Sequence, residues 1–140
     1  MNLTRITTVE DFLLIAPFVF RLKEADHRGK WEQSSGTDFV NLFFADFNQR
    51  IFYGEIKDNK LSYFCAIIPT NNEEVTAWLF YVDLDFYEQT TEIITLIKED
   101  LKNLGFKSVF FTTPRIRSSY KRWAEKHGAK QVSITYKAEL

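Results

Sequence analysis

Basic residues gather in the last part of the chain, from Pro114 onward. Glu125 is the only acidic residue within this basic group, whose members are Arg115, Arg117, Lys121, Arg122, Lys126 and Lys130. Clustered positive charge can attract phosphates, nucleic acid or an acidic protein surface. A solvated helix face has the same composition, so the pattern leaves both interpretations open.

Acidic residues flank the third of three consecutive β-type runs. Glu73 and Glu74 lie at its beginning, and Asp83 lies at its end. A carboxylate can act as a general base, provided that its pKa is raised and that it reaches the group it deprotonates. A solvent-exposed turn explains the presence of Glu73 and Glu74 equally well. Asp83 also fits a residue that ends a strand or caps a helix.

Metal binding and nucleophilic catalysis find no support in the residue spacing. The two histidines, His27 and His127, are far apart, and Cys65 is the only cysteine. This set contains no spacing typical of metal ligands, and a single cysteine excludes an internal disulfide. Cys65 lies in an apolar run and is predicted to be a small core residue.

The period of the apolar residues predicts the elements that position these groups. Strands are predicted at 3–7, 51–57, 61–69, 75–84, 109–113 and 131–139, and helices at 8–22, 37–47, 85–104 and 118–127. The middle three strands should form an antiparallel meander, with a turn at 58–60. Pro17 should kink or restart the first helix, and glycines at 105 and 128 should end the last two.

Length and composition favour one α/β domain over residues 1–140. The formal net charge is −1, which argues against wholesale binding of nucleic acid. No apolar run approaches the roughly 18 residues that span a bilayer, and no export signal is recognisable. We therefore expect an intracellular, cytoplasmic protein without a membrane partner.

The order of the predicted elements resembles the GNAT (N-acetyltransferase) fold over nearly the whole chain. Residues 78–132 carry the more specific likeness, in Tyr81-Val82-Asp83, Asn103-Leu104-Gly105-Phe106, Val109-Phe110-Phe111 and Trp123-Ala124-Glu125-Lys126-His127-Gly128-Ala129. The resemblance implies a mixed α/β fold. Its central sheet would have six to seven mostly antiparallel strands, flanked by about four helices.

The sequence departs from the GNAT pattern in the turn between the fourth strand and the long helix. GNAT enzymes have a glycine-rich turn there, whose amides bind the pyrophosphate of acetyl-CoA at a helix N-terminus. The corresponding residues, 85–91, include no glycine and two carboxylates, Asp85 and Glu88. These side chains are predicted to cap the amides that the phosphates need and to repel the cofactor.

The resemblance also indicates which residues would handle acetyl-CoA. Many GNAT enzymes have a tyrosine in the last helix that protonates the departing thiolate; alignment at Gly128 places Ala124 there, so Tyr120, one turn earlier, is the candidate acid. The cofactor would bind to strand amides along 79–82 and to nearby basic side chains. The candidates are Leu79, Tyr81, Val82, Arg115, Arg117 and Arg122.

Three functions follow from these observations. The first is a GNAT-like domain that has lost acetyl transfer and needs no cofactor. It would serve as a binding or structural module for another protein or for itself, in a phage virion for example. The second is a divergent N-acyltransferase that depends on acetyl-CoA, with Tyr120, Glu74 or Asp83 as catalytic candidates. The third is an adaptor that binds nucleic acid or an acidic partner through the basic group.

Overall fold

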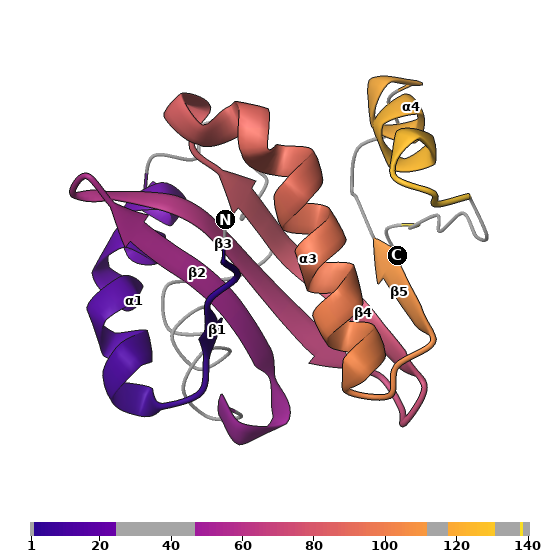
Figure 1. The fold of residues 1–140 in the computed structure, drawn as a ribbon, viewed down its shortest axis with the longest axis horizontal. Coiled ribbons are helices and arrows are strands. Elements are labelled where there is room, and N and C mark those ends of the chain that lie inside the picture. Colours follow the sequence, from indigo (N-terminus) through magenta and orange to yellow (C-terminus); the bar gives the residue numbers. More distant parts are fainter. Residues whose placement is uncertain (1, 25–46, 112–117, 131–137, 139–140) are drawn as a thin grey trace.

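A computed structural model describes residues 2–24, 47–111, 118–130 and 138 of the chain (Figure 1). Predicted elements at 37–47 and 131–139, and the end of the strand predicted at 109–113, fall largely outside these residues. The described elements, with η for a 3-10 helix, are β1 (Arg5–Ile6), α1 (Val9–Glu24), η1 (Phe47–Gln49), β2 (Ile51–Lys57), β3 (Lys60–Pro69), β4 (Glu74–Val82), η2 (Leu84–Gln89), α3 (Thr90–Asn103), β5 (Ser108–Phe111) and α4 (Ser118–Lys126).

The five described strands form one sheet in the order β1-β2-β3-β4-β5. Every neighbouring pair is antiparallel except β4 and β5, which are parallel because α3 carries the chain back between them. The predicted turn is confirmed: Asp58 and Asn59 have φ of 54° and 59°, which suits a two-residue hairpin loop. The sheet is thus mostly antiparallel, as the sequence predicts.

One face of the sheet packs against α1. Thr8 begins this helix, since its hydroxyl accepts a hydrogen bond from the amide of Asp11 at 3.2 Å. The assigned helix continues through Pro17, so the predicted restart does not occur. Its apolar stripe is buried on the sheet; the buried residues of this cluster are Ile6, Phe12, Ile15, Ala16, Val19, Phe52, Leu61, Phe64 and Ala66.

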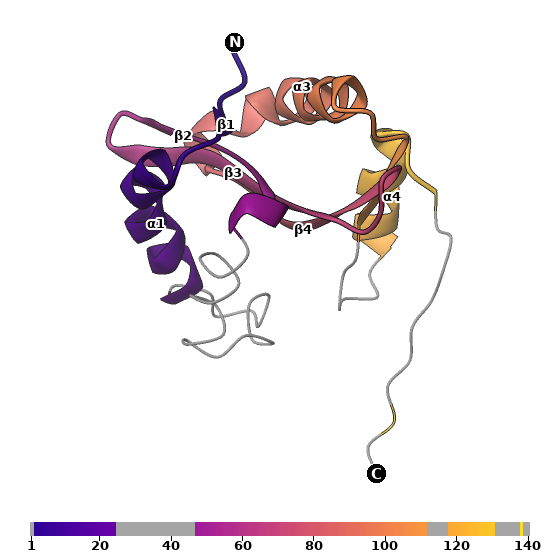
Figure 2. The same cartoon turned by 90° about the horizontal axis from the view of Figure 1, so that it is seen from below.

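The other face packs against α3, on the opposite side of the sheet (Figure 2). Alternation along the strands explains the two cores, because Phe52 faces α1 whereas its neighbour Tyr53 faces α3. The Tyr53 hydroxyl donates a 2.6 Å hydrogen bond to Oδ2 of Asp100 on α3, and Nη1 of Arg5 lies 3.4 Å from the same oxygen. This polar contact fixes α3 over β1 and β2.

The long predicted helix begins later than expected. The sequence places its start at Asp85, whereas the chain forms η2 over 84–89 and α3 begins at Thr90. The predicted ends are confirmed, since Gly105 and Gly128 follow α3 and α4 with φ of 99° and 81°. Such angles are in the left-handed region that glycine adopts at helix ends.

Burial of Cys65 gives the stability of the fold a predictable dependence on pH. The thiol is 2 % exposed, and burial raises its pKa from 9.0 to about 12. Above pH 9 the unfolded chain loses this proton while the folded chain keeps it, so stability should fall by up to about 1.4 kcal/mol per pH unit. Below pH 9 the contribution is fully present.

Urea denaturation at pH 8, 9 and 10 checks this expectation, with Cys65→Ala as the comparison. The variant should be less stable at pH 8, because it leaves a small cavity, but its stability should fall less steeply between pH 9 and 10. Equal slopes for the two proteins would contradict a buried neutral thiol.

Candidate functional site

The central feature of β4 is a bulge at Trp78. In the β3–β4 pairing Ala66 lies opposite Leu79 and Ile67 lies opposite Ala77, so Trp78 has no opposite residue. The described part of β5 pairs only with the four residues of β4 before the bulge, from Glu74 to Ala77. On its β5 side, the second half of β4 has no paired strand among the described residues, and this side is called the opening.

Hydrogen bonding along β3 shows which amides of β4 face that opening. The Asp83 amide donates to the carbonyl of Ser62 at 2.9 Å, so its backbone polar groups face β3. Backbone amides and carbonyls alternate in direction along a strand. The backbone groups of Tyr81 and Leu79 therefore also face β3. The backbone groups of Val82 and Phe80 face the β5 side.

Of the predicted strand contacts, Val82 alone presents its amide at the opening. Leu79 and Tyr81 lie on the same stretch, but their amides are directed to β3. Phe80 was missed by the sequence analysis. The cause is that the direction of an amide depends on the register with β3, which the sequence pattern does not reveal.

The turn after β4 is capped by Asp83, and the prediction that Asp85 is the cap was wrong. Oδ1 of Asp83 accepts from the Asp85 amide at 3.0 Å, and its Oδ2 accepts from the Tyr81 hydroxyl at 3.0 Å. Burial, followed by these contacts with Asp83, raises the pKa of Tyr81 to about 12. The Asp85 carboxylate instead forms an ion pair with Lys60.

The first turn of α3 is consequently not capped in the predicted way. Its N-cap residue is Gln89, whose side chain makes no capping hydrogen bond, and Glu88 is exposed. Thr90 donates its amide and its hydroxyl to the carbonyl of Tyr87. The helix start keeps the partial positive charge of its dipole near the end of β4.

Glu73 and Glu74 lie in the β3–β4 hairpin. Oε1 of Glu74 accepts from the Asn71 side-chain amide at 2.8 Å, and Oε1 of Glu73 accepts from Nζ of Lys107 at 2.9 Å. Nine strand steps separate Glu74 from Asp83, which corresponds to about 25–30 Å. The two carboxylates therefore cannot serve one amine, and each has structural partners where it lies.

The basic group is only partly described. Arg115 and Arg117 lie outside the described residues, Tyr120 is in the first turn of α4, and Arg122 is exposed. Lys98 of α3 joins the group, since its Nζ donates to the carbonyl of His127 at 3.2 Å. Burial, with Lys126 and Lys98 nearby, lowers the pKa of His127. The sequence analysis missed Lys98 because it lies one element away.

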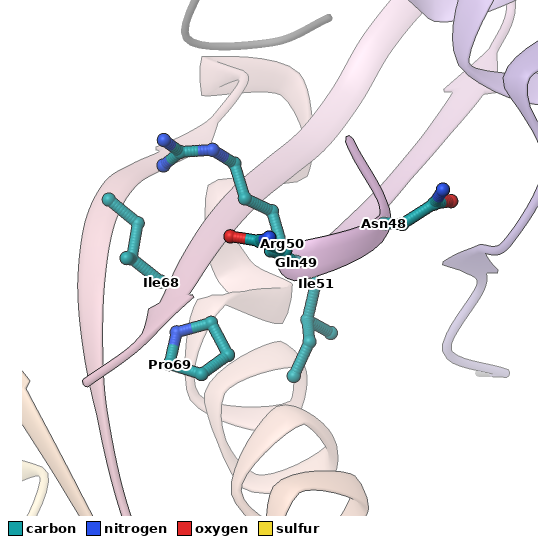
Figure 3. Close-up of a pocket in the computed structure, with 6 residues that line it drawn as sticks. All are labelled: Asn48, Gln49, Arg50, Ile51, Ile68 and Pro69. Carbon is teal, nitrogen blue, oxygen red and sulfur yellow. The ribbon is translucent and has the colours of Figure 1, made fainter. Parts of the chain in front are cut away.

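A cavity of about 380 Å³ lies beside the start of β2 and the end of β3. Its walls are formed by Asn48, Gln49, Arg50, Ile51, Ile68 and Pro69 (Figure 3). Nε and Nη1 of Arg50 are buried, and its side chain extends to the same side as Ile68. This cavity was not predicted from the sequence.

Two further features are absent from the part of the chain that the structure describes. None of its helices combines the length and apolar character needed to cross a membrane. Its histidine, cysteine and carboxylate side chains form no group of three that could hold a metal ion.

The mostly antiparallel sheet, the parallel β4–β5 pair and the helix between them match the fold of solved GNAT-type acetyltransferases. The chain superimposes over its full length on a ribosomal-protein-alanine N-acetyltransferase from Brucella melitensis biovar Abortus 2308, with a TM-score of 0.67 and 14% identity over 100% of both chains. An aminoglycoside acetyltransferase from a soil metagenome, solved with sisomicin, gives a TM-score of 0.65 at 13% identity, over 99% of this chain and 95% of that one.

A possible acetyltransferase from Clostridium difficile 630 is also similar, with a TM-score of 0.62 and 13% identity over 100% of this chain and 99% of that chain. No protein-family model matches the sequence, and a search of curated proteins gives no match. The chain thus has the GNAT fold, at low sequence identity to these structures.

Proposed function

We propose that the chain is an N-acyltransferase that uses acetyl-CoA or a related acyl-CoA. One observation carries this proposal: after the bulge at Trp78, the amides of Phe80 and Val82 face the opening beside β5. The pantetheine arm of CoA contains two amides, which can pair with strand amides as a further strand would. The structural neighbours, which are acetyltransferases by name, support the same function.

The start of α3 supports binding of the other end of the cofactor. A pyrophosphate next to the end of β4 would lie near the first turn of α3, where the helix dipole favours an anion. Gln89 makes no capping hydrogen bond of its own. Without glycine, side chains prevent the phosphates from approaching this backbone as closely as they approach a glycine-rich turn. We therefore expect acetyl-CoA to bind more weakly than in GNAT enzymes that have such a turn.

The proposed reaction is direct transfer of the acyl group. The nitrogen of a neutral amine attacks the thioester carbonyl, an amide bond forms, the carbon–sulfur bond breaks, and the thiolate leaves with the electron pair. The nitrogen loses one proton and the thiolate gains one, so no further reactant is needed. Tyr120 stays the candidate acid, while Asp83 and Glu74 have other partners in this structure.

A domain that has lost acetyl transfer and binds another protein is the second candidate. The observation in its favour is the acidic character of the turn, where Asp83, Asp85 and Glu88 lie close to the proposed pyrophosphate position without a glycine among them. Lys60 neutralises part of this charge by pairing with Asp85. The two candidates differ in whether acetyl-CoA binds.

Thermal unfolding with acetyl-CoA distinguishes them. A ligand present at 100 times its Kd stabilises the folded state by about 2.7 kcal/mol, which should raise Tm by roughly 5–10 °C for a chain of this size. ATP at the same concentration is the control for general attraction of phosphates. If acetyl-CoA raises Tm no more than ATP does, the acyltransferase proposal fails and the binding module is favoured.

A further inference from the structure

The bulge at Trp78 changes which side chains of β4 meet α3. Side chains alternate between the two faces of a strand, so residues three apart normally face opposite sides. Ala77 and Phe80 are three apart, yet both belong to the core between the sheet and α3. The extra residue of the bulge restores them to one face. They are thus neighbours on the α3 side of β4.

Two of the four side chains around this point are small. Phe80 lies opposite Cys65 of β3, and Ala77 lies opposite Ile67. All four residues belong to the core beneath α3. The short side chains of Ala77 and Cys65 explain why a space remains there in an otherwise closely packed core.

That space is a second cavity, of about 20 Å³. It lies between the sheet, α3 and α4, and its lining includes Cys65, Ala77, Phe80, Ile97, Val109 and Trp123. Lys98 is the one charged residue among the described residues of the lining, and its Nζ donates to the carbonyl of His127 at 3.2 Å. Such a volume accommodates one small group, and a cavity with apolar walls stays free of water. The cavity therefore suits a short piece of hydrocarbon.

The cavity has a buried end and a partly exposed end. Cys65, Ala77 and Ile97 are buried, whereas Phe80 and Trp123 are partly exposed. The ring centroids of Phe80 and Trp123 lie 6.4 Å apart, with the rings tilted by 44°. Phe80 also directs its backbone amide to the opening beside β5. One residue thus borders the opening with its backbone and the cavity with its side chain.

The proposed position of the pantetheine arm leads toward this cavity. With the pyrophosphate near the first turn of α3, the arm runs along β4 from Val82 toward Phe80, and the thioester lies beyond Phe80. From Ala77 backward, β5 occupies the edge of β4. Three strand steps, or about 10 Å, separate Phe80 from Ala77. The acyl group therefore ends beside the stretch of β4 that lines the cavity.

We propose that this cavity receives the hydrocarbon end of the acyl group, and that the preferred donor is propionyl-CoA or butyryl-CoA rather than acetyl-CoA. The inference rests on the proposed function, which places the thioester near Phe80. The single methyl group of acetyl ends near the aromatic pair, whereas one or two further carbons reach the buried end at Ala77 and Cys65. Ala77 then limits the length of the acyl group.

The transfer reaction is the same for these donors. The amide bond forms as the carbon–sulfur bond breaks, and the thiolate gains the proton that the amine loses. The preference arises from burial of hydrocarbon, since each methylene group moved from water into an apolar site increases affinity about fourfold. The gain should stop once the cavity is filled, because further carbons stay in water.

Isothermal titration calorimetry tests the length preference with CoA and its acetyl, propionyl, butyryl and hexanoyl thioesters. We expect propionyl-CoA to bind about fourfold and butyryl-CoA about tenfold more tightly than acetyl-CoA, and hexanoyl-CoA no more tightly than butyryl-CoA. Free CoA gives the contribution of the rest of the cofactor. Equal affinities for the acetyl, propionyl and butyryl thioesters would overturn the inference. So would a continued rise to hexanoyl-CoA, because that result indicates an open apolar surface.

Three variants assign the preference to this cavity. Ala77→Val fills it from β4 and should bring butyryl-CoA and acetyl-CoA within twofold of each other. Ile97→Ala enlarges it from α3 and should make hexanoyl-CoA the tightest donor. Ala66→Val is the matched control, because Ala66 is buried on the opposite face of the sheet, and it should leave the order of the donors unchanged. Circular dichroism confirms folding; if Ala77→Val does not fold, Ile97→Ala decides.

The outcomes separate this inference from the proposed function. If acetyl-CoA binds but the longer thioesters gain nothing, the cavity inference fails while the acyltransferase function stands. If neither CoA nor any thioester binds, the function fails and the inference fails with it. An unchanged order of donors in both Ala77→Val and Ile97→Ala overturns the assignment to this cavity, even where butyryl-CoA binds most tightly.

Discussion

Replacement of Phe12 by alanine should lower the free energy of unfolding by about 3–5 kcal/mol, the range for deletion of a buried aromatic ring. Phe12 is 0% exposed, and its ring centroid lies 5.0 Å from that of Phe52 and 5.5 Å from that of Phe47. The change removes the apolar area of the ring together with these aromatic contacts. It therefore acts on the packing between α1 and the sheet.

Urea denaturation followed by circular dichroism measures this effect. Leu13→Ala provides the control on the same helix, because Leu13 is 51% exposed. Its loss should change the free energy by no more than about 0.5 kcal/mol. Similar losses for Phe12→Ala and Leu13→Ala would mean that α1 does not pack in the orientation described.

Replacement of Val82 by proline should weaken acetyl-CoA binding at least thirtyfold. Proline has no amide hydrogen, and its ring would project into the opening beside β5. The Val82 amide faces away from β3, so the β3–β4 hydrogen bonds do not depend on it. Proline is tolerated at such strand positions, and we expect the fold to be kept.

Isothermal titration calorimetry with acetyl-CoA gives the affinity of each protein. Val82→Ala shortens the side chain but keeps the amide, so its affinity should be within threefold of the unchanged protein. Circular dichroism confirms that both variants are folded. Equal affinity for the proline and alanine variants would place the pantetheine arm away from this strand edge.

Local sequence patterns predict much of the fold. The apolar stripe of α3, with Ile93, Ile97 and Leu101 at helical spacing, is buried as expected. The β2–β3 hairpin also follows from its residues, because Asp58 and Asn59 adopt the positive φ that the turn requires. These features depend on neighbours a few residues apart, which is the range that a sequence pattern reports.

The candidate site depends on contacts between distant residues and was predicted less well. The bulge at Trp78 arises because Ala77 pairs with Ile67 and Leu79 with Ala66. The ion pair of Asp85 is with Lys60 on another strand. The position of Arg50 opposite Ile68 was not predicted, since it requires the sheet register. Residue types indicated the end of β4 and the turn after it as the candidate site, but pairing between distant residues sets the geometry of that site.

The single parallel pair in the sheet has a consequence for how the protein assembles. The strands from β2 to β4 are joined by hairpins, whereas β5 aligns with β4 across a connection that contains the 14 residues of α3. Closing such a crossover costs more chain entropy than closing a hairpin. We therefore expect β5 to join the sheet after the meander has formed, and local opening of β5 and α4 to abolish binding while the meander persists.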